Sequence, residues 1–436
     1  SSSPENSSAA PSSSGYNPSS GPAATPAPSK GPTETSEGIA KEIDDIDKQI
    51  EEKNAGIAEK NVQKAQYASD DKTYQSLLTN LNTATSEVDT ATQNISKLET
   101  ELHTIETSIN TKKAQVENIQ DPVVFTEYKE DFDKQKESLN EEIKDLEKQQ
   151  QEKQQAIEKE KETKTEKEKE KTNLEKQVQE YEAANPKAEI EQINKEISTL
   201  KSDIQSLESQ KASKQKELDD ARETEKSDAT VYGQMKAIRE NNEFTKWIMD
   251  YATSDGVRNK YDNANWGGAW CAVFTSDMTE ALYAEVAKRI GKNGLSNSSQ
   301  GLDGLQMAMH AVAWGNKYQG DLNSLGINKK ASIDITHMSE QERKDAVRNG
   351  LIYPGMTFEY ESNGGYHTGF VESINADLTW NTIEGNSTGG KVGANRRDAT
   401  NNRLSSVTDS TLKVYAWLVQ SGKMTAAEAN RRLQSA

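Results

Sequence analysis

Cysteine is nearly absent from this 436-residue chain, in which Cys271 is the only one. An internal disulfide, an iron–sulfur cluster and a cysteine-based zinc site are therefore excluded. Aromatic residues make up only 6% of the chain and hydrophobic residues only 32%. A single globular domain of this length would need more apolar mass to offset the entropy that its ordered chain loses. Much of the chain is therefore predicted to be extended helix or disorder.

The chain is also short of basic residues, and its formal net charge at pH 7 is -18. Residues 1–227 hold 48 acidic and 31 basic side chains, whereas the remainder holds 23 and 22, so the acidic excess lies in the first half. A chain with this balance and no basic stripe is not expected to bind nucleic acid. Long apolar runs are missing as well, since none approaches the ~20 residues that cross a bilayer as a helix.

What is present divides into three segments of different composition. Residues 1–35 are rich in Ser, Pro, Ala and Gly, which predicts a disordered tether. Such an opening is typical of the stretch that follows a removed signal peptide or a lipid-anchored cysteine, so we expect a secreted or cell-envelope protein. Residues 227–436 contain all six Trp and most of the Gly, which predicts a globular domain large enough for one core.

Between these segments, residues 36–226 carry the apolar spacing of a coiled coil. Large aliphatic side chains recur at intervals of three and four, which places a narrow apolar seam on one face of each helix. Pro122 and Pro186 break the pattern, because proline lacks an N–H and crowds the preceding turn. These two breaks predict three long helices, the first of about 80 residues with only a soft interruption near residues 69–71.

The candidate nucleophile is Cys271. Gly267 and Gly268 form a turn that leads into an apolar helical pattern, so Cys271 is expected at or near a helix N-terminus. Free backbone N–H groups and the positive end of the helix dipole stabilise a thiolate there and lower the pKa of the thiol. The alternative is that Cys271 is a small buried apolar residue, which is the common role of a lone cysteine.

A cysteine nucleophile needs a base, and the chain has four histidines. His103 lies in the coiled coil with no evident partner, and His310 lies in an apolar helical stretch where packing explains it. His337 precedes the capping box of Ser339 and reads as a loop residue. His367 differs, because it lies in a strand pattern entered through glycines, where a substrate or another backbone can approach closely.

The group that orients the imidazole is expected on the next strand, which ends with Glu384 and Asn386. A hairpin would bring both near His367, and residues two apart share one face of a regular strand. A carboxylate fixes the tautomer and also stabilises the imidazolium, whereas an amide does only the first. We therefore assign Glu384 to the imidazole and Asn386 to support of the substrate or the loop.

Four motifs in this order resemble the CHAP domain, the cysteine/histidine-dependent amidohydrolase/peptidase family of cell-wall hydrolases. They are Trp-Cys-Ala-x-Phe at residues 270–274, Pro-Gly at 354–355, Tyr-His-Thr-Gly-Phe-Val at 366–371 and Ile-Glu-Gly-Asn at 383–386. The resemblance implies a long α-helical coiled coil followed by an α+β papain-like domain with an antiparallel sheet. It implies that Cys271 is the nucleophile, His367 the base, Glu384 the orienting acid and Asn386 a fourth polar member.

The sequence departs from the family in two respects. An inserted stretch, expected to be helical, lengthens the separation between Cys271 and His367 over about residues 291–350, and Met356 stands where many members have Asp. No cofactor is implied. Some CHAP enzymes bind calcium, and oxygen ligands are present at Asp255 and Asp262 and at two asparagines that follow. Because these residues follow no regular calcium-loop spacing, no metal is expected.

These roles predict a secreted peptidoglycan hydrolase, with the choice between amidase and endopeptidase left open. A coiled coil followed by a CHAP domain also resembles, in architecture alone, the PcsB-type division hydrolases, which a membrane complex of the FtsEX kind activates through the coil. That resemblance implies a coil that restrains the enzyme. Whether the coil forms a homodimer is left open.

A different class of function also fits the composition, namely a coiled-coil scaffold or adhesin whose CHAP domain only binds the cell wall. The complete set of Cys271, His367 and Glu384 favours the enzyme. A phage or interbacterial lysin is a variant of the enzyme, but such proteins usually carry a wall-binding repeat, and none is visible in the sequence.

Overall fold

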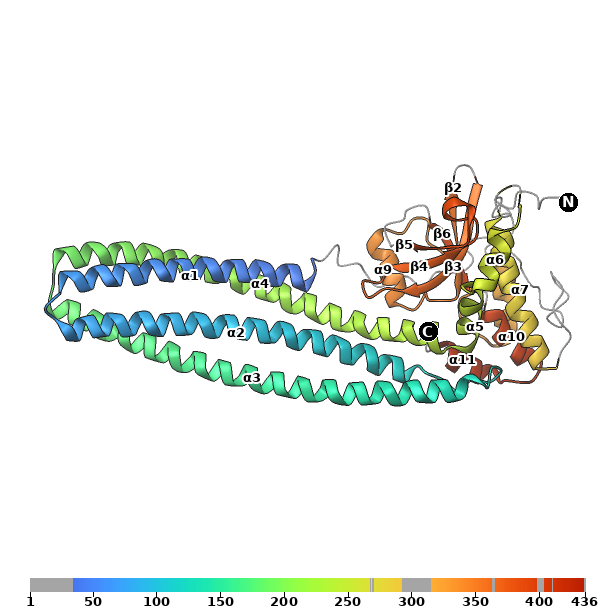
Figure 1. Ribbon diagram of the computed structural model, residues 1–436, viewed down its shortest axis with the longest axis horizontal. Coiled ribbons are helices and arrows are strands. Elements are labelled where there is room, and N and C mark those ends of the chain that lie inside the picture. Colours follow the sequence, from blue (N-terminus) through green and yellow to red (C-terminus); the bar gives the residue numbers. More distant parts are fainter. Residues whose placement is uncertain are drawn as a thin grey trace. The chain divides into compact units, whose positions relative to one another are not determined.

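The computed structural model describes residues 34–434, except for residues 267, 269, 292–314, 363–364, 398–403 and 410. Helices make up most of this part of the chain, and a small antiparallel sheet lies in its C-terminal part (Figure 1). The helices are α1 (Ser36–Tyr67), α2 (Lys72–Glu117), α3 (Tyr128–Ala184), α4 (Ala188–Asn241), α5 (Glu243–Ala252), α6 (Asp255–Asp262), α7 (Cys271–Arg289), α8 (Gly315–Ser324), α9 (Glu340–Arg348), α10 (Leu412–Gln420), α11 (Ala426–Gln434) and the 3-10 helix η3 (Thr388–Gly390). The strands are β1 (Ser332–Asp334), β2 (Met356–Ser362), β3 (Gly365–Ile374), β4 (Trp380–Glu384), β5 (Gly393–Arg397) and β6 (Leu404–Asp409).

The chain forms two compact units. The coil unit consists of residues 33–109 and 144–226. The sheet unit contains residues 110–143 and everything described after residue 226. The end of α2, the beginning of α3 and the loop between them therefore belong to the sheet unit, although their apolar spacing continues that of the coil.

The coil is built from four long helices, so the predicted first helix of about 80 residues is wrong. The chain reverses between α1 and α2, where the Asp71 side chain accepts a hydrogen bond from the backbone N–H of Tyr74 at 3.0 Å and caps α2. The Gln75 amide donates to the carbonyl oxygens of Ala68 and Ser69 at 3.2 and 2.9 Å. Polar side chains thus satisfy the turn without a proline or a glycine.

The two breaks expected at proline are confirmed, because α2 ends before Pro122 and α4 begins after Pro186.

His103 differs from the expectation that it has no partner. Its Nε2 lies 3.4 Å from a carboxylate oxygen of Glu225, and its side chain is only 12% exposed. Within the coil unit, His103 is therefore a packed residue with a partner on another helix.

A single antiparallel sheet of six strands is described, in the order β1-β6-β2-β3-β4-β5. β3 and β4 form the hairpin that the sequence predicts, with Phe370 opposite Ile383. This pairing brings the end of β4 beside the middle of β3, two residues after His367. Val231 and Met235, near the end of α4, are buried in a cluster with apolar residues of β2, β3 and β4. None of the described helices is long and apolar enough to cross a membrane.

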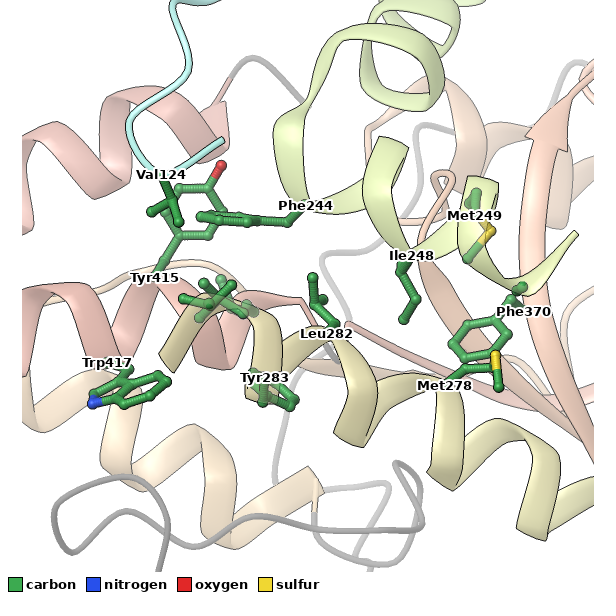
Figure 2. Packing of buried hydrophobic residues seen from close by; sticks show 14 of the residues in the cluster. Val124, Phe244, Ile248, Met249, Met278, Leu282, Tyr283, Phe370, Tyr415 and Trp417 are labelled. Carbon is green, nitrogen blue, oxygen red and sulfur yellow. The ribbon is translucent and has the colours of Figure 1, made fainter. Parts of the chain in front are cut away.

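The main core of the sheet unit gathers apolar side chains from α5, α7 and α10 (Figure 2). Phe244 comes from α5, Met278 and Leu282 come from α7, and Tyr415 comes from α10; all four are almost fully buried. Val124, from the loop between α2 and α3, lies in the same cluster. The core that supports α7 therefore includes side chains from more than 100 residues earlier in the chain.

The loop between α2 and α3 is held by the carboxylate of Glu243, the first residue of α5. The backbone N–H groups of Val123, Val124 and Phe125 donate to this carboxylate at 2.9, 2.8 and 2.7 Å. Burial raises the pKa of Glu243, while the three hydrogen bonds act in the opposite direction by favouring the charged form. The loop is thus a fixed part of the sheet unit.

Candidate active site

Cys271 is the first residue of α7, so its predicted place at a helix start is confirmed. The backbone N–H of Phe274 donates to the carbonyl of Trp270 at 3.0 Å and closes the first turn. Trp270 occupies the N-cap position and makes no capping hydrogen bond with its side chain. The N–H groups of the first turn are therefore not capped by the Trp270 side chain, and that of Ala272 hydrogen-bonds to the Cys271 sulfur.

His367 and Glu384 meet across the β3–β4 hairpin. Nε2 of His367 lies 2.6 Å from Oε1 of Glu384. The His367 side chain is 12% exposed and that of Glu384 is fully buried. The hydroxyl of Thr382 donates to the other oxygen of the Glu384 carboxylate. Both carboxylate oxygens are therefore engaged, which fixes the imidazole in one orientation.

Two glycines permit this close packing. A Cβ atom on Gly369 would lie 2.7 Å from Cγ of Glu384, and one on Gly385 would lie 2.4 Å from Cβ of Phe274. Contacts this short do not occur between carbon atoms, so a side chain at either position would separate the end of β4 from its neighbours. The glycines beside His367 and Glu384 are thus required by geometry.

The sulfur of Cys271 is hydrogen-bonded to the imidazole of His367. Because Nε2 faces Glu384, the nitrogen that remains for the sulfur is Nδ1. Burial pushes the pKa of the Cys271 thiol up. The hydrogen bond and the charge of His367, together with backbone hydrogen bonds from Thr368 and Ala272, outweigh burial and bring this pKa below its ordinary value.

His367 is shifted in the complementary direction. Burial alone would lower the pKa of the imidazole, but the hydrogen bonds and charges of Cys271 and Glu384 raise it to about 9. A thiol with a lowered pKa beside an imidazole with a raised pKa favours the thiolate–imidazolium pair over the neutral thiol and imidazole. Such a pair places an activated nucleophile next to a proton donor, which is the arrangement needed for acyl transfer.

Asn386 lies just beyond the end of β4 and does not follow the geometry expected for it. Its φ is +53°, in the left-handed region that Asn tolerates better than most residues, so the regular alternation of a strand ends before it. The partner of His367 Nε2 is Glu384. The expectation that Glu384 and Asn386 share one strand face is therefore wrong, and Asn386 shapes the turn that follows Glu384.

Sequence reasoning missed Thr382, whose hydroxyl completes the contacts of the Glu384 carboxylate. The available signal was its spacing, since a residue two positions before Glu384 lies on the same face of β4.

His310 lies outside the described residues. His337 precedes α9, whose capping box is confirmed at Ser339. The part of the inserted stretch that is described contains β1 as well as α8 and α9.

No group of three or more His, Cys, Asp and Glu side chains placed to hold a metal ion occurs within the described part of the chain. Asp262, one of the oxygen ligands considered above, accepts a hydrogen bond from the backbone N–H of Val392 at 2.7 Å. Its carboxylate therefore joins α6 to the segment before β5.

Comparison with known proteins finds no family model, no curated protein and no solved structure that matches this chain. A function is therefore assigned from the geometry of Cys271, His367 and Glu384, together with the resemblance of the four sequence motifs to the CHAP domain.

Glu384→Gln is expected to lower turnover by about 10- to 100-fold. This loss is smaller than the ~10⁴-fold loss that follows when an amide in place of the triad carboxylate holds the histidine in the wrong tautomer. Gln can present its carbonyl oxygen to Nε2 while Thr382 accepts from its NH₂, so the orientation survives and the charge is lost. Without the carboxylate, the pKa of His367 falls from about 9. The imidazolium then loses its proton at lower pH, and the alkaline limb of the kcat/KM profile moves toward neutral pH.

Asn386→Ala is the matched control, because it removes a neighbouring polar group without touching the imidazole. It should lower turnover less than Glu384→Gln and leave the alkaline limb in place. Should Asn386→Ala move that limb more than Glu384→Gln does, the amide rather than the carboxylate would be the orienting group.

Proposed function

We propose that this protein is a cysteine amidohydrolase/peptidase of the CHAP type that hydrolyses peptidoglycan. The observation that carries the proposal is the hydrogen-bonded chain from Cys271 through His367 to Glu384, with the sulfur at a helix start. The helix that begins with the nucleophile packs on the antiparallel strand that carries the base, and this packing supports the proposal of a papain-like enzyme. The four motifs add the cell wall as the class of substrate.

The mechanism follows from these positions. The Cys271 thiolate attacks the amide carbonyl, and the developing oxyanion is stabilised by backbone N–H groups at the start of α7. The His367 imidazolium gives its proton to the nitrogen of the leaving amine, and the C–N bond breaks to leave a thioester. His367 then takes a proton from water, whose oxygen attacks the thioester. The acid product leaves, and the thiolate and the imidazolium are restored.

Access to the nucleophile is restricted in this conformation, because Cys271 is only 1% exposed. The approach of a substrate carbonyl to the sulfur is therefore hindered in this conformation. This restriction supports an enzyme whose basal rate is low and is raised by a signal. We propose that the coil is the element that receives the signal, from a membrane complex of the FtsEX kind, at a site outside the cytoplasm where peptidoglycan lies.

The test is digestion of purified peptidoglycan with the full chain, followed by mass spectrometry of the new termini. The full chain is required because residues 123–125 are part of the core of the sheet unit. New termini on sugars or on stem peptides support the enzyme and identify the bond. Binding to sedimented wall material without any new terminus would replace the enzyme with the scaffold or adhesin.

A further inference from the structure

Three aromatic side chains stack just ahead of the nucleophile. The ring centroids of Tyr261 and Trp266 are 5.3 Å apart with planes at 11°, and those of Trp266 and Trp270 are 5.6 Å apart at 22°. Tyr261 and Trp270 are also stacked, at 5.6 Å and 17°. The three rings are thus nearly parallel, and Trp266 rests on both of the others.

Trp266 is the member of this stack that reaches the surface. Tyr261 is 1% exposed and Trp270 is 3% exposed, whereas Trp266 is only partly buried. The indole N–H of Trp266 donates to the carbonyl of Tyr261 at 2.9 Å. This hydrogen bond and the two stacked rings fix the plane of Trp266, so it presents a rigid aromatic surface whose polar N–H is already satisfied.

The stack is continuous with the catalytic residues. Trp270 directly precedes Cys271, and a Cβ atom placed on Gly385 would lie 3.0 Å from Cζ3 of Trp270. Gly385 in turn follows Glu384. A ligand ring held on Trp266 would therefore lie one aromatic ring away from the residue that precedes Cys271.

We propose that Trp266 is a sugar-binding platform that holds one pyranose ring of the glycan strand next to Cys271. The proposal rests on the peptidoglycan hydrolase function and specifies its substrate. One face of a pyranose carries C–H bonds with slight positive charge, which match the negative face of an indole, and stacking removes both apolar faces from water. Asn263 and Asn265, which precede Trp266 closely in the sequence, are exposed, and their amides can pair with hydroxyl and N-acetyl groups.

The platform also indicates which bond is cut. A ring stacked next to the nucleophile places the scissile amide near the sugar, because the lactyl ether separates the ring carbon from the amide carbonyl carbon by only three bonds. This position fits the amide that joins the stem peptide to the sugar's lactyl group, and it does not fit an amide far along the stem. The specificity is therefore predicted to be that of an amidase.

Binding is tested first, with the full-length Cys271→Ala variant and peptide-free glycan strands, by saturation-transfer NMR. Trp266→Ala should weaken binding by about tenfold or more, as loss of one stacking partner does in other aromatic sites. Trp266→Tyr should retain part of the binding. Trp247→Ala is the matched control, because Trp247 is another partly buried tryptophan that stacks on Tyr251 and Phe125 instead, and its loss should leave binding unchanged.

A second measurement separates a platform from a purely structural stack. Trp266→Ala in the active chain should raise KM for glycan-linked substrate, and it should leave unchanged the pH midpoint at which iodoacetamide labels Cys271. A shifted midpoint with unchanged glycan binding would mean that Trp266 only supports Trp270, and would overturn the platform. Equal binding by Trp266→Ala and the parent would also overturn it. Glycan binding that is lost with Trp266, in a chain that hydrolyses nothing, would support the platform while refuting the hydrolase.

Discussion

Cys271→Ala is expected to abolish peptidoglycan hydrolysis, with a loss of at least about 10⁴-fold, as for removal of the nucleophile in other acyl-transfer enzymes. The chain has no second cysteine that could substitute. The change removes one sulfur atom from a buried position, so the variant should stay folded. Release of soluble fragments from purified wall measures the activity, and circular dichroism of the same sample checks the fold.

The chemical state of the thiol offers the matching control on the unmodified protein. Iodoacetamide labelling of Cys271 should show a pH midpoint below the ~8.5 of an ordinary cysteine, because the pKa of the thiol is lowered by His367. Burial slows labelling by the same factor at every pH, so the midpoint still reports the pKa. Wall hydrolysis by Cys271→Ala at the wild-type rate would refute the enzyme.

The second large effect is on stability. Phe125→Ala is expected to reduce the free energy of unfolding of the sheet unit by about 3–5 kcal/mol, the usual cost of deleting a fully buried aromatic ring. Phe125 has no exposed surface, and its ring centroid lies 6.1 Å from those of Phe244 and Trp247. Its loss leaves a cavity between the α2–α3 loop and α5. Urea unfolding followed by tryptophan fluorescence measures the change, because all six Trp lie after residue 240.

Tyr251→Ala is the matched control for this prediction. Tyr251 also stacks on Trp247, at 5.0 Å, but it is 38% exposed. Truncation there exposes little and leaves the core filled, so the loss should be about 1 kcal/mol or less. Equal losses for the two variants would show that residues 123–125 are not part of the core.

The local parts of the site were predictable from the sequence, because each depends on residues close together in the chain. The Gly-Gly pair before an apolar helical pattern predicts Cys271 at a helix start, and a hairpin of two short strands brings Glu384 to His367. The preference for Glu384 over Asn386 also agrees with the observed contact. The sequence argument preferred Glu384 for its charge, whereas the structure adds a second reason, because the backbone of Asn386 is no longer in a strand conformation.

The long-range features were not predictable. The reversal before α2 depends on Asp71 and Gln75, which are polar residues of a kind found along the whole coil. The heptad spacing is present on both sides of the break at Pro122, so nothing in the pattern assigns residues 110–143 to a different unit from the coil. Its place in the sheet unit depends on contacts with residues far along the chain, among them the carboxylate of Glu243 and the rings around Phe125.

The separation in sequence between Phe125 and Glu243 has a consequence for synthesis of the protein in the cell. The two residues are 118 positions apart. At ~5–20 residues per second, a ribosome needs about 6–24 s to make the intervening chain. During that interval Val124 and Phe125 have left the ribosome without the side chains that will cover them. The sheet unit cannot complete its core in the order of translation, and it closes around these residues only after the coil helices have been made.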